Sequence, residues 1–241
     1  MTMAFTTRPT PPDDPDGGLS LRDFRVIAAL VHEEAGIHLP ETKRPLVEGR
    51  LAKRLRLLGL DGFAAYRKLI DSADGAAERG HMLAALTTNV TRFNREPHHF
   101  KALREDVLPP LAAHARAGGR VRLWSAACST GEEPFSMALS LLAVLPEAAR
   151  LDVRVLATDI NAEVVARGRK GLFGAAALAK VPAADRAQWF GADKGGTSRV
   201  GPELMSLVAF RVLNLMGDWP MRGVFDAVFC RNVAIYFDTP T

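Results

Sequence analysis

The chain has 241 residues, of which 48% are hydrophobic and 24% charged, as in a globular protein with one large or two smaller domains. No run of about 18 uncharged apolar residues occurs, which excludes a membrane-spanning helix, and the presence of only two cysteines excludes a disulfide framework. The net charge of +4 is small, but it is unevenly distributed along the chain.

Composition and periodicity divide the chain into four parts. Residues 1–19 are rich in Pro, Asp and Gly and have no apolar core of signal-peptide length, so we expect a flexible tail. Residues 20–90 are expected to form a small all-helical domain, followed by a linker and a helix over residues 91–120. Residues 121–241 are expected to form an α/β domain, with a small antiparallel β-subdomain inserted at about residues 189–213.

The helical part is defined by apolar residues at helical spacing and by terminal signals. Ser20 is a typical first residue and Gly36 a typical stop for the first helix, and Gly59 closes the second. The predicted helices are residues 20–35, 43–58, 61–70 and 76–90.

The second predicted helix carries most of the excess positive charge. Only one acid, Glu48, accompanies six basic residues: Lys43, Arg44, Arg50, Lys53, Arg54 and Arg56. Such a segment is either a solvated helix face or a surface for an anionic partner. Nucleic acid is a poor candidate, because the aromatic residues needed for base stacking are absent.

The α/β part contains three continuous apolar runs, and the first two are each followed by a helical segment. The runs are "VRLWSAA", "LDVRVLATDI" and "FDAVFCRNV". This alternation predicts a parallel sheet covered by helices on both faces, with its ligand beyond the carboxyl ends of the strands. The segment between the second and third runs reads as an inserted hairpin, with strands at residues 198–200 and 207–212.

The loop after the first strand, "SAACSTGEE", has one glycine and two carboxylates, Glu132 and Glu133. A pyrophosphate would be repelled there, whereas a ligand with a cationic amine or sulfonium would be attracted. Asp159 ends the next strand, where an acid can bond ribose hydroxyls. The alternative is that both glutamates only stabilise the start of the following helix. We expect Glu133 to contact the cofactor and Glu132 to cap the helix.

Four motifs in one order resemble the CheR-type chemotaxis receptor methyltransferases. They are "LTTNVTRFNREPHHF", "RLWSAACSTGEEPFSMA", "LATDI" and "FDAVFCRNVAIYFD", and "AGIHLPETKRPLVEGRLAKRLRLLGL" resembles that family's N-terminal helical domain. The resemblance covers residues 19–238. It implies a Rossmann-like, class I methyltransferase domain that transfers the methyl group of S-adenosylmethionine to glutamate side chains of chemoreceptors, leaving S-adenosylhomocysteine.

The resemblance also implies the site residues, motif by motif. Catalytic roles fall to Arg95, Arg231 and Tyr236. Cofactor contacts fall to Asn89, Thr91, Arg95, Glu133, Asp159, Asn214, Leu215, Asn232 and Val233. Each has a structural alternative: Asn214 could close a turn, Val233 and Tyr236 could belong to the core, and Arg95 could form an ion pair with Glu96. A glutamate carboxylate is already ionised at pH 7, so the arginines would orient it rather than activate it.

The partner implied by the resemblance is the acidic helical bundle of a chemoreceptor's cytoplasmic region. Lys43, Arg50, Lys53, Arg54 and Arg56 would dock on it. We expect a cytoplasmic monomer that binds no metal, because His98 and His99 have no further ligand at suitable spacing.

The sequence departs from the family pattern in several places. Asn94 stands where an aromatic residue is usual and Phe135 where tyrosine is common, and we expect both to be tolerated. "KGGTSRVG" looks too short for the loop that binds a receptor's C-terminal pentapeptide, so we expect untethered recognition. The chain lacks the helix and strands that follow "YFD" in family members, so we expect a C-terminal truncation that would expose a strand edge. A non-catalytic module that docks on receptors or binds the cofactor is therefore the alternative function.

Overall fold

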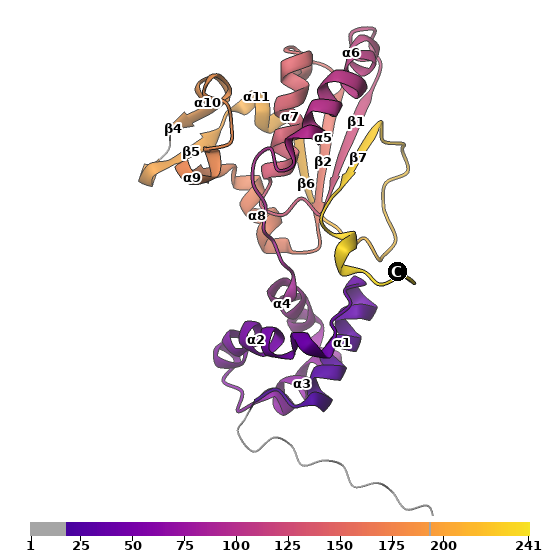
Figure 1. The fold of residues 1–241 in the computed structure, drawn as a ribbon, viewed down its shortest axis with the longest axis vertical. Coiled ribbons are helices and arrows are strands. Elements are labelled where there is room, and N and C mark those ends of the chain that lie inside the picture. The colour runs from indigo at the N-terminus through magenta and orange to yellow at the C-terminus, as the bar shows by residue number, and fades with distance from the viewer. Residues whose placement is uncertain (1–17, 193) are drawn as a thin grey trace, which may run out of the picture. The chain divides into compact units, whose positions relative to one another are not determined.

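The computed structural model describes residues 18–192 and 194–241, and the chain divides into two units, Met1–Leu86 and Thr87–Thr241 (Figure 1). Most of the expected tail lies outside the described residues, but Leu19 is buried and so belongs to the first unit. No helix in the described ranges is long and apolar enough to cross a membrane.

The first unit is a bundle of short helices. Their bounds are α1 (Leu21–Ala35), η1 (Glu41–Lys43), α2 (Arg44–Leu58), α3 (Phe63–Asp71), η2 (Ala73–Gly75) and α4 (Ala76–Leu86). Ser20 caps α1 by accepting a hydrogen bond from the N–H of Asp23 at 3.1 Å. Gly36 and Gly59 end α1 and α2 in the left-handed conformation. The predicted start of the first helix and both predicted stops are confirmed.

The core of the first unit contains one buried carboxylate, Glu78 of α4. It accepts hydrogen bonds from two N–H groups of Arg54, with Nε at 3.0 Å, and from the hydroxyl of Tyr66 at 2.9 Å. Burial by itself raises the pKa of Glu78, but the Arg54 and Tyr66 bonds outweigh it and the pKa is lowered overall. The carboxylate of Glu78 therefore links helices α2, α3 and α4 through hydrogen bonds.

The last predicted helix is too long by four residues, because α4 ends at Leu86 rather than at residue 90. The sequence that follows, Thr87-Thr88-Asn89-Val90, contains β-branched residues and an asparagine, which are weak helix formers. The amide of Asn89 donates to the hydroxyl of Thr87 at 3.2 Å, a local bond that competes with helical pairing.

The second unit contains a four-stranded parallel sheet in the order β6-β2-β1-β7. The strands are β1 (Val121–Ala126), β2 (Val153–Asp159), β6 (Val208–Val212) and β7 (Ala227–Cys230). The helices are α5 (Pro97–Ala102), a π-helical turn η3 (Leu103–Val107), α6 (Leu108–Arg116), α7 (Glu132–Val144) and α8 (Ala162–Lys170), with a turn η4 (Ala148–Arg150) before β2. The three predicted apolar strands are present, and their carboxyl ends lie at one edge, as expected.

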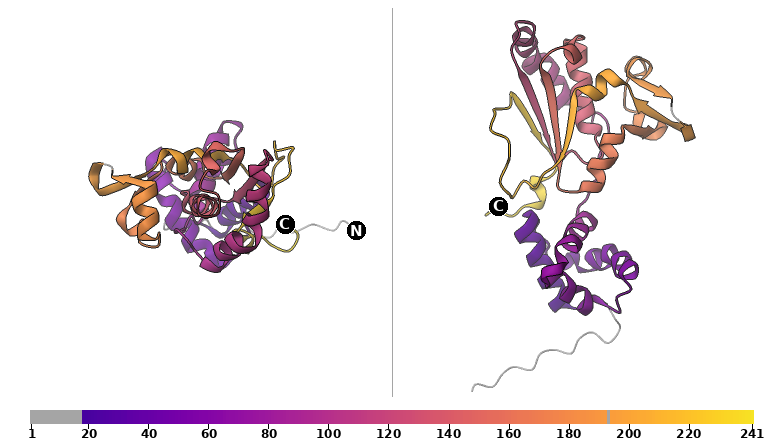
Figure 2. Two further views of the ribbon diagram at one scale, coloured as in Figure 1. Left: turned by 90° about the horizontal axis from the view of Figure 1, so that it is seen from above. Right: turned by 180° about the vertical axis from the view of Figure 1, so that it is seen from behind.

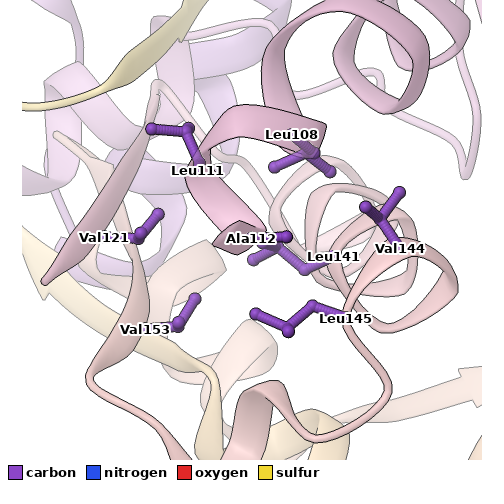
Figure 3. A pocket seen from close by; sticks show the side chains of 8 residues that line it. All are labelled: Leu108, Leu111, Ala112, Val121, Leu141, Val144, Leu145 and Val153. Carbon is purple, nitrogen blue, oxygen red and sulfur yellow. The ribbon is translucent and has the colours of Figure 1, made fainter. Parts of the chain in front are cut away.

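Helices α6 and α7 pack on the first two strands through aliphatic side chains (Figure 3). These are Leu108, Leu111 and Ala112 of α6, Leu141, Val144 and Leu145 around the end of α7, and Val121 and Val153 of the strands. The shallow pocket that they line has no room for a water molecule, so it is a packing seam.

The expectation of helices on both faces of the sheet is wrong for the described residues. Side chains alternate along a strand, so Trp124 points away from the face that Leu123 presents to the helical core. Trp124 packs on Trp219 and Phe225, with ring centroids 4.9 and 5.3 Å apart. These two aromatic residues lie in the connection from β6 to β7. In the described part of the chain, that connection covers Trp124, whereas Val228, its partner on β7, is half exposed.

A small antiparallel sheet in the order β3-β5-β4 is also present, beside the main sheet (Figure 2). Its elements are β3 (Leu172–Gly174), α9 (Ala175–Leu178), α10 (Ala183–Trp189), β4 (Phe190–Ala192), η5 (Lys194–Gly196) and β5 (Thr197–Val200), and α11 (Pro202–Ser206) leads back. The predicted hairpin partner, residues 207–212, is wrong. That segment is β6, which pairs in parallel with β2 because Val208 and Phe210 are buried in the main core.

Candidate active site

The loop between β1 and α7 has an unusual backbone. Ala127, Ser129 and Gly131 all have positive φ, at 65°, 50° and 102°. For the two non-glycine residues this conformation costs about 1–3 kcal/mol each, and it persists only where the surroundings enforce it. A side chain at Gly131 would approach the ring of Phe210 to 3.1 Å, which explains the one glycine.

Contacts from two other segments hold this loop. The N–H of Ser129 donates to Asp159 Oδ2 at 2.8 Å, and its hydroxyl donates to the carbonyl of Asn89 at 2.9 Å. The N–H of Cys128 donates to the carbonyl of Thr158 at 2.8 Å. Two of the predicted cofactor residues, Asn89 and Asp159, are thereby brought to the same loop.

Asp159 is buried at the end of β2 and also accepts the N–H of Asn161 at 2.9 Å. Burial raises its pKa, although these backbone hydrogen bonds oppose the rise. One N–H of the loop is thus already paired with a protein carboxylate. The loop is unlike a phosphate cradle, in which backbone N–H groups point at the ligand.

The two glutamates of the loop have different environments in the first turn of α7. Glu132 accepts the hydroxyl of Thr130 at 2.6 Å, and the N-cap residue is Gly131. The predicted capping by Glu132 is therefore limited to its charge in the first turn of the helix. Glu133 Oε1 accepts the hydroxyl of Ser125 at 2.7 Å, and Oε2 accepts Nη1 of Arg231 at 3.2 Å. Burial raises the pKa of Glu133 to about 7, in spite of the Ser125 bond and the charge of Arg231.

Arg231 follows β7 and is almost fully enclosed, with a side chain only 10% exposed. Besides Glu133, its guanidinium donates from Nη2 to the carbonyl of Arg95 and to Glu96 Oε2, the latter at 3.0 Å. The guanidinium also lies over the rings of Phe100 and Phe229, 5.4 and 5.7 Å from their centroids. Its Nε, buried without a partner, faces no solvent. Arg231 therefore holds protein groups together and presents no free edge to a ligand.

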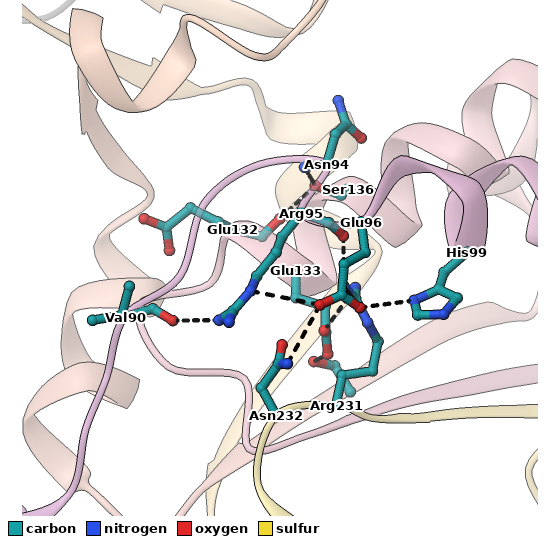
Figure 4. A network of polar contacts seen from close by, with 11 residues as sticks. Val90, Asn94, Arg95, Glu96, His99, Glu132, Glu133, Ser136, Arg231 and Asn232 are labelled. Carbon is teal, nitrogen blue, oxygen red and sulfur yellow. Dashed lines mark hydrogen bonds and ion pairs between the residues drawn. The ribbon is translucent and has the colours of Figure 1, made fainter. Parts of the chain in front are cut away.

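Arg95 is placed differently, although it belongs to the same network (Figure 4). Its Nη1 donates to the carbonyl of Val90 at 2.9 Å, and its Nε lies 4.0 Å from Glu96 Oε1. The side chain is 34% exposed. Of the two arginines predicted to hold the substrate carboxylate, Arg95 has the more exposed side chain.

The remaining predicted site residues make fewer contacts that bear on their predicted roles. Asn232 has a φ of 56° and donates to Glu96 Oε1 at 3.4 Å. Asn214 closes a turn, since its Oδ1 accepts the N–H of Met216 at 3.0 Å. Thr91, Leu215, Val233 and Tyr236 are partly exposed, and Tyr236 ends the short turn η6 (Ala234–Tyr236).

Sequence reasoning gave too little weight to two residues of this network. Glu96 was considered only as an ion-pair partner of Arg95, yet its closer cationic partner is Arg231. Ser125, the hydrogen-bond partner of Glu133, carried no signal beyond its position at the end of a strand. Within the described ranges, no three His, Cys, Asp or Glu side chains gather as metal ligands would.

The basic residues of α2 differ in their surroundings. Lys43, Lys53 and Arg56 are exposed. Arg54 is bound to Glu78, and Nη1 of Arg50 donates to the carbonyl of Leu86 at 2.6 Å. Two of the five predicted docking residues therefore also hold the helical unit together.

Both units match models of known protein families. A family model described as "CheR methyltransferase, SAM binding domain" matches residues 89–241, and one described as "CheR methyltransferase, all-alpha domain" matches residues 22–87. The chain is 49% identical over 215 residues to a probable chemotaxis protein methyltransferase of Rhizobium etli, covering 88% of this chain and 80% of the relative. It is 42% identical over 228 residues to the chemotaxis protein methyltransferase of Escherichia coli, covering 92% and 77%. A Borreliella burgdorferi protein of the same name is 32% identical over 216 residues.

Proposed function

The chain belongs to the CheR methyltransferase family, and from this premise we propose how its residues divide the work of methylating chemoreceptors. The protein is a protein-glutamate O-methyltransferase of chemotaxis that uses S-adenosylmethionine. When bound, the cofactor supplies a methyl group on a positively charged sulfur. The chain's own residues must bind this cation, exclude phosphate-bearing ligands and orient the receptor's glutamate.

The cofactor part of the proposal rests on Glu133. The Glu133 side chain is only 13% exposed and receives one arginine N–H and one hydroxyl. Its charge is therefore incompletely neutralised, which agrees with its raised pKa. A cationic ligand in the crevice would supply the missing charge, so the residues present fit S-adenosylmethionine. We assign the cofactor contacts to Asn89, Thr91, Arg95, Glu133, Asp159, Asn214, Leu215, Asn232 and Val233.

The substrate part rests on Arg95. Its side chain is a third exposed, and a guanidinium can donate N–H groups to a carboxylate. The glutamate nucleophile is ionised at pH 7 and needs no general base, so the role of Arg95 is to orient it toward the methyl carbon. Tyr236 is partly exposed and is assigned to the substrate side. Arg231 acts on the substrate indirectly, through the groups that it holds.

Receptor docking is assigned to α2. Lys43, Lys53 and Arg56 offer exposed positive charge to an acidic helical bundle, and Arg50 and Arg54 support the helix from within while adding to its field. We propose that a monomer docks in this way without a pentapeptide tether, since the small turn η5 leads directly into β5. Both cysteines are free, which suits the cytoplasm as the place of action.

Methyl transfer is tested by incubating the chain with methyl-labelled S-adenosylmethionine and receptor-containing membranes. The expected result is label on the receptor that base releases as methanol, the signature of a glutamate methyl ester. Cofactor binding without such label would instead establish the alternative function, a non-catalytic module.

Arg95→Ala tests the orienting role. We expect kcat to fall by about 100-fold or more, because a misplaced nucleophile loses most of the advantage of proximity. The Kd for S-adenosylmethionine should rise far less, by less than about 10-fold, because Arg95 is one of several proposed cofactor contacts. Arg92→Ala is the matched control, an exposed arginine on the same segment. Equal losses of kcat and cofactor affinity in Arg95→Ala would contradict the assignment.

A further inference from the structure

Glu96 stands where the donors of the active site converge (Figure 4). Its carboxylate accepts Nη2 of Arg231 at 3.0 Å and the amide of Asn232 at 3.4 Å, and it lies 4.0 Å from Nε of Arg95. His99 Nδ1 is 3.3 Å away, but without hydrogen-bond geometry. Glu96 thus links the segment before α5 to the loop after β7.

The backbone at this point is constrained as well. Asn94 and Glu96 have φ values of 51° and 56°, so two left-handed residues flank Arg95. Such residues persist only when their contacts enforce them. The N–H of Asn94 donates to the hydroxyl of Ser136 at 3.0 Å and its amide donates to the carbonyl of Lys180 at 2.9 Å. On the other side of Arg95, the restraints are the contacts of the Glu96 side chain and the bond from Arg231 to the carbonyl of Arg95.

The charges explain why a carboxylate is needed there. Arg231 lies between two carboxylates, Glu133 and Glu96, with its remaining Nη2 bond on the carbonyl of Arg95. If Glu96 were neutral, the guanidinium of Arg231 would be paired on one side only and could turn toward another carboxylate. The nearest new carboxylate during catalysis would be that of the substrate.

We propose that Glu96 is a positioning residue for methyl transfer: by holding Arg231 and Asn232 it fixes the turn that aims Arg95 and keeps Arg231 from competing for the substrate glutamate. This inference rests on the proposed function, because it takes Arg95 as the residue that meets that glutamate. Its distinguishing feature is a requirement for negative charge at Glu96.

The test compares Glu96→Gln, Glu96→Asp and the control Glu105→Gln, which neutralises an exposed glutamate on the turn η3. In the full chain, kcat of Glu96→Gln should fall by about 10- to 100-fold, while the receptor KM and the cofactor Kd stay within about 3-fold of wild type. Glu96→Asp keeps the charge and should recover part of kcat. Glu105→Gln should match wild type.

Several outcomes would overturn the inference. Unchanged kcat in Glu96→Gln would remove the positioning role while leaving the methyltransferase assignment intact. A faster rate or a lower receptor KM would make Glu96 a competitor of the substrate. Loss of cofactor binding in both Glu96 variants would make it a folding residue. Inactivity of wild type and Glu105→Gln together would overturn the proposed function, and this inference with it.

Discussion

Each unit of this protein contains a largely enclosed arginine–glutamate pair, and the two pairs differ in how completely the carboxylate is satisfied. In the helical unit, Glu78 receives two N–H groups from Arg54 and the hydroxyl of Tyr66, and these bonds lower its pKa against the effect of burial. In the sheet unit, Glu133 receives one N–H from Arg231 and one hydroxyl, and burial raises its pKa to about 7.

The difference separates a structural pair from a binding group. A buried carboxylate with a full set of donors gains nothing from a further cation, so the Arg54 pair stabilises the fold. A buried carboxylate with too few donors is costly in the free protein and is relieved by a cationic ligand. On our proposal, the same two residue types therefore serve folding in one unit and cofactor binding in the other.

Breaking the structural pair should have the largest effect. Arg54→Ala leaves Glu78 buried without its cation, and we expect the free energy of unfolding to fall by about 3–5 kcal/mol. Chemical denaturation of the full chain measures this loss. The control is Arg25→Ala, which removes an exposed pair with Glu41, with side chains 64% and 56% exposed, and should cost at most about 1 kcal/mol. Similar losses for both variants would contradict the structural role of Arg54.

A smaller effect is expected from the neighbouring lysine, which is exposed. Lys53→Glu should leave stability unchanged but raise the receptor KM by about 2- to 5-fold at low salt, with the difference shrinking as salt increases. Lys68→Glu reverses an exposed lysine on α3 and serves as the control. If the two variants raise the KM equally, docking does not depend on α2.

Local signals in the sequence were sufficient for much of the fold. Ser20, Gly36 and Gly59 marked helix ends, because capping depends on a few adjacent residues. The three apolar strands and the position of the loop between β1 and α7 were likewise predicted correctly, since each depends on a short run of residues. The resemblance of ordered motifs supplied the family.

Contacts between residues that are distant in the sequence could not be predicted from local sequence signals. The segment at residues 207–212 alternates as a hairpin strand would, and only its fit beside β2 makes it part of the parallel sheet. The enclosure of Arg231 is another example, because its partners Glu96 and Glu133 are 135 and 98 residues away in the chain. The spacing of these residues in the sequence does not indicate that Glu96 and Glu133 contact Arg231.

The most direct test of the cation site is the Kd of S-adenosylmethionine as a function of pH. Near pH 6 the raised pKa keeps most of Glu133 protonated and neutral, and above pH 7 the carboxylate is ionised. The account predicts that affinity of the wild-type chain increases as pH rises from about 5.5 to 7.5, by roughly tenfold, and that Glu133→Gln binds weakly with little pH dependence. Wild-type affinity that does not change with pH, or tight binding by Glu133→Gln, would contradict it.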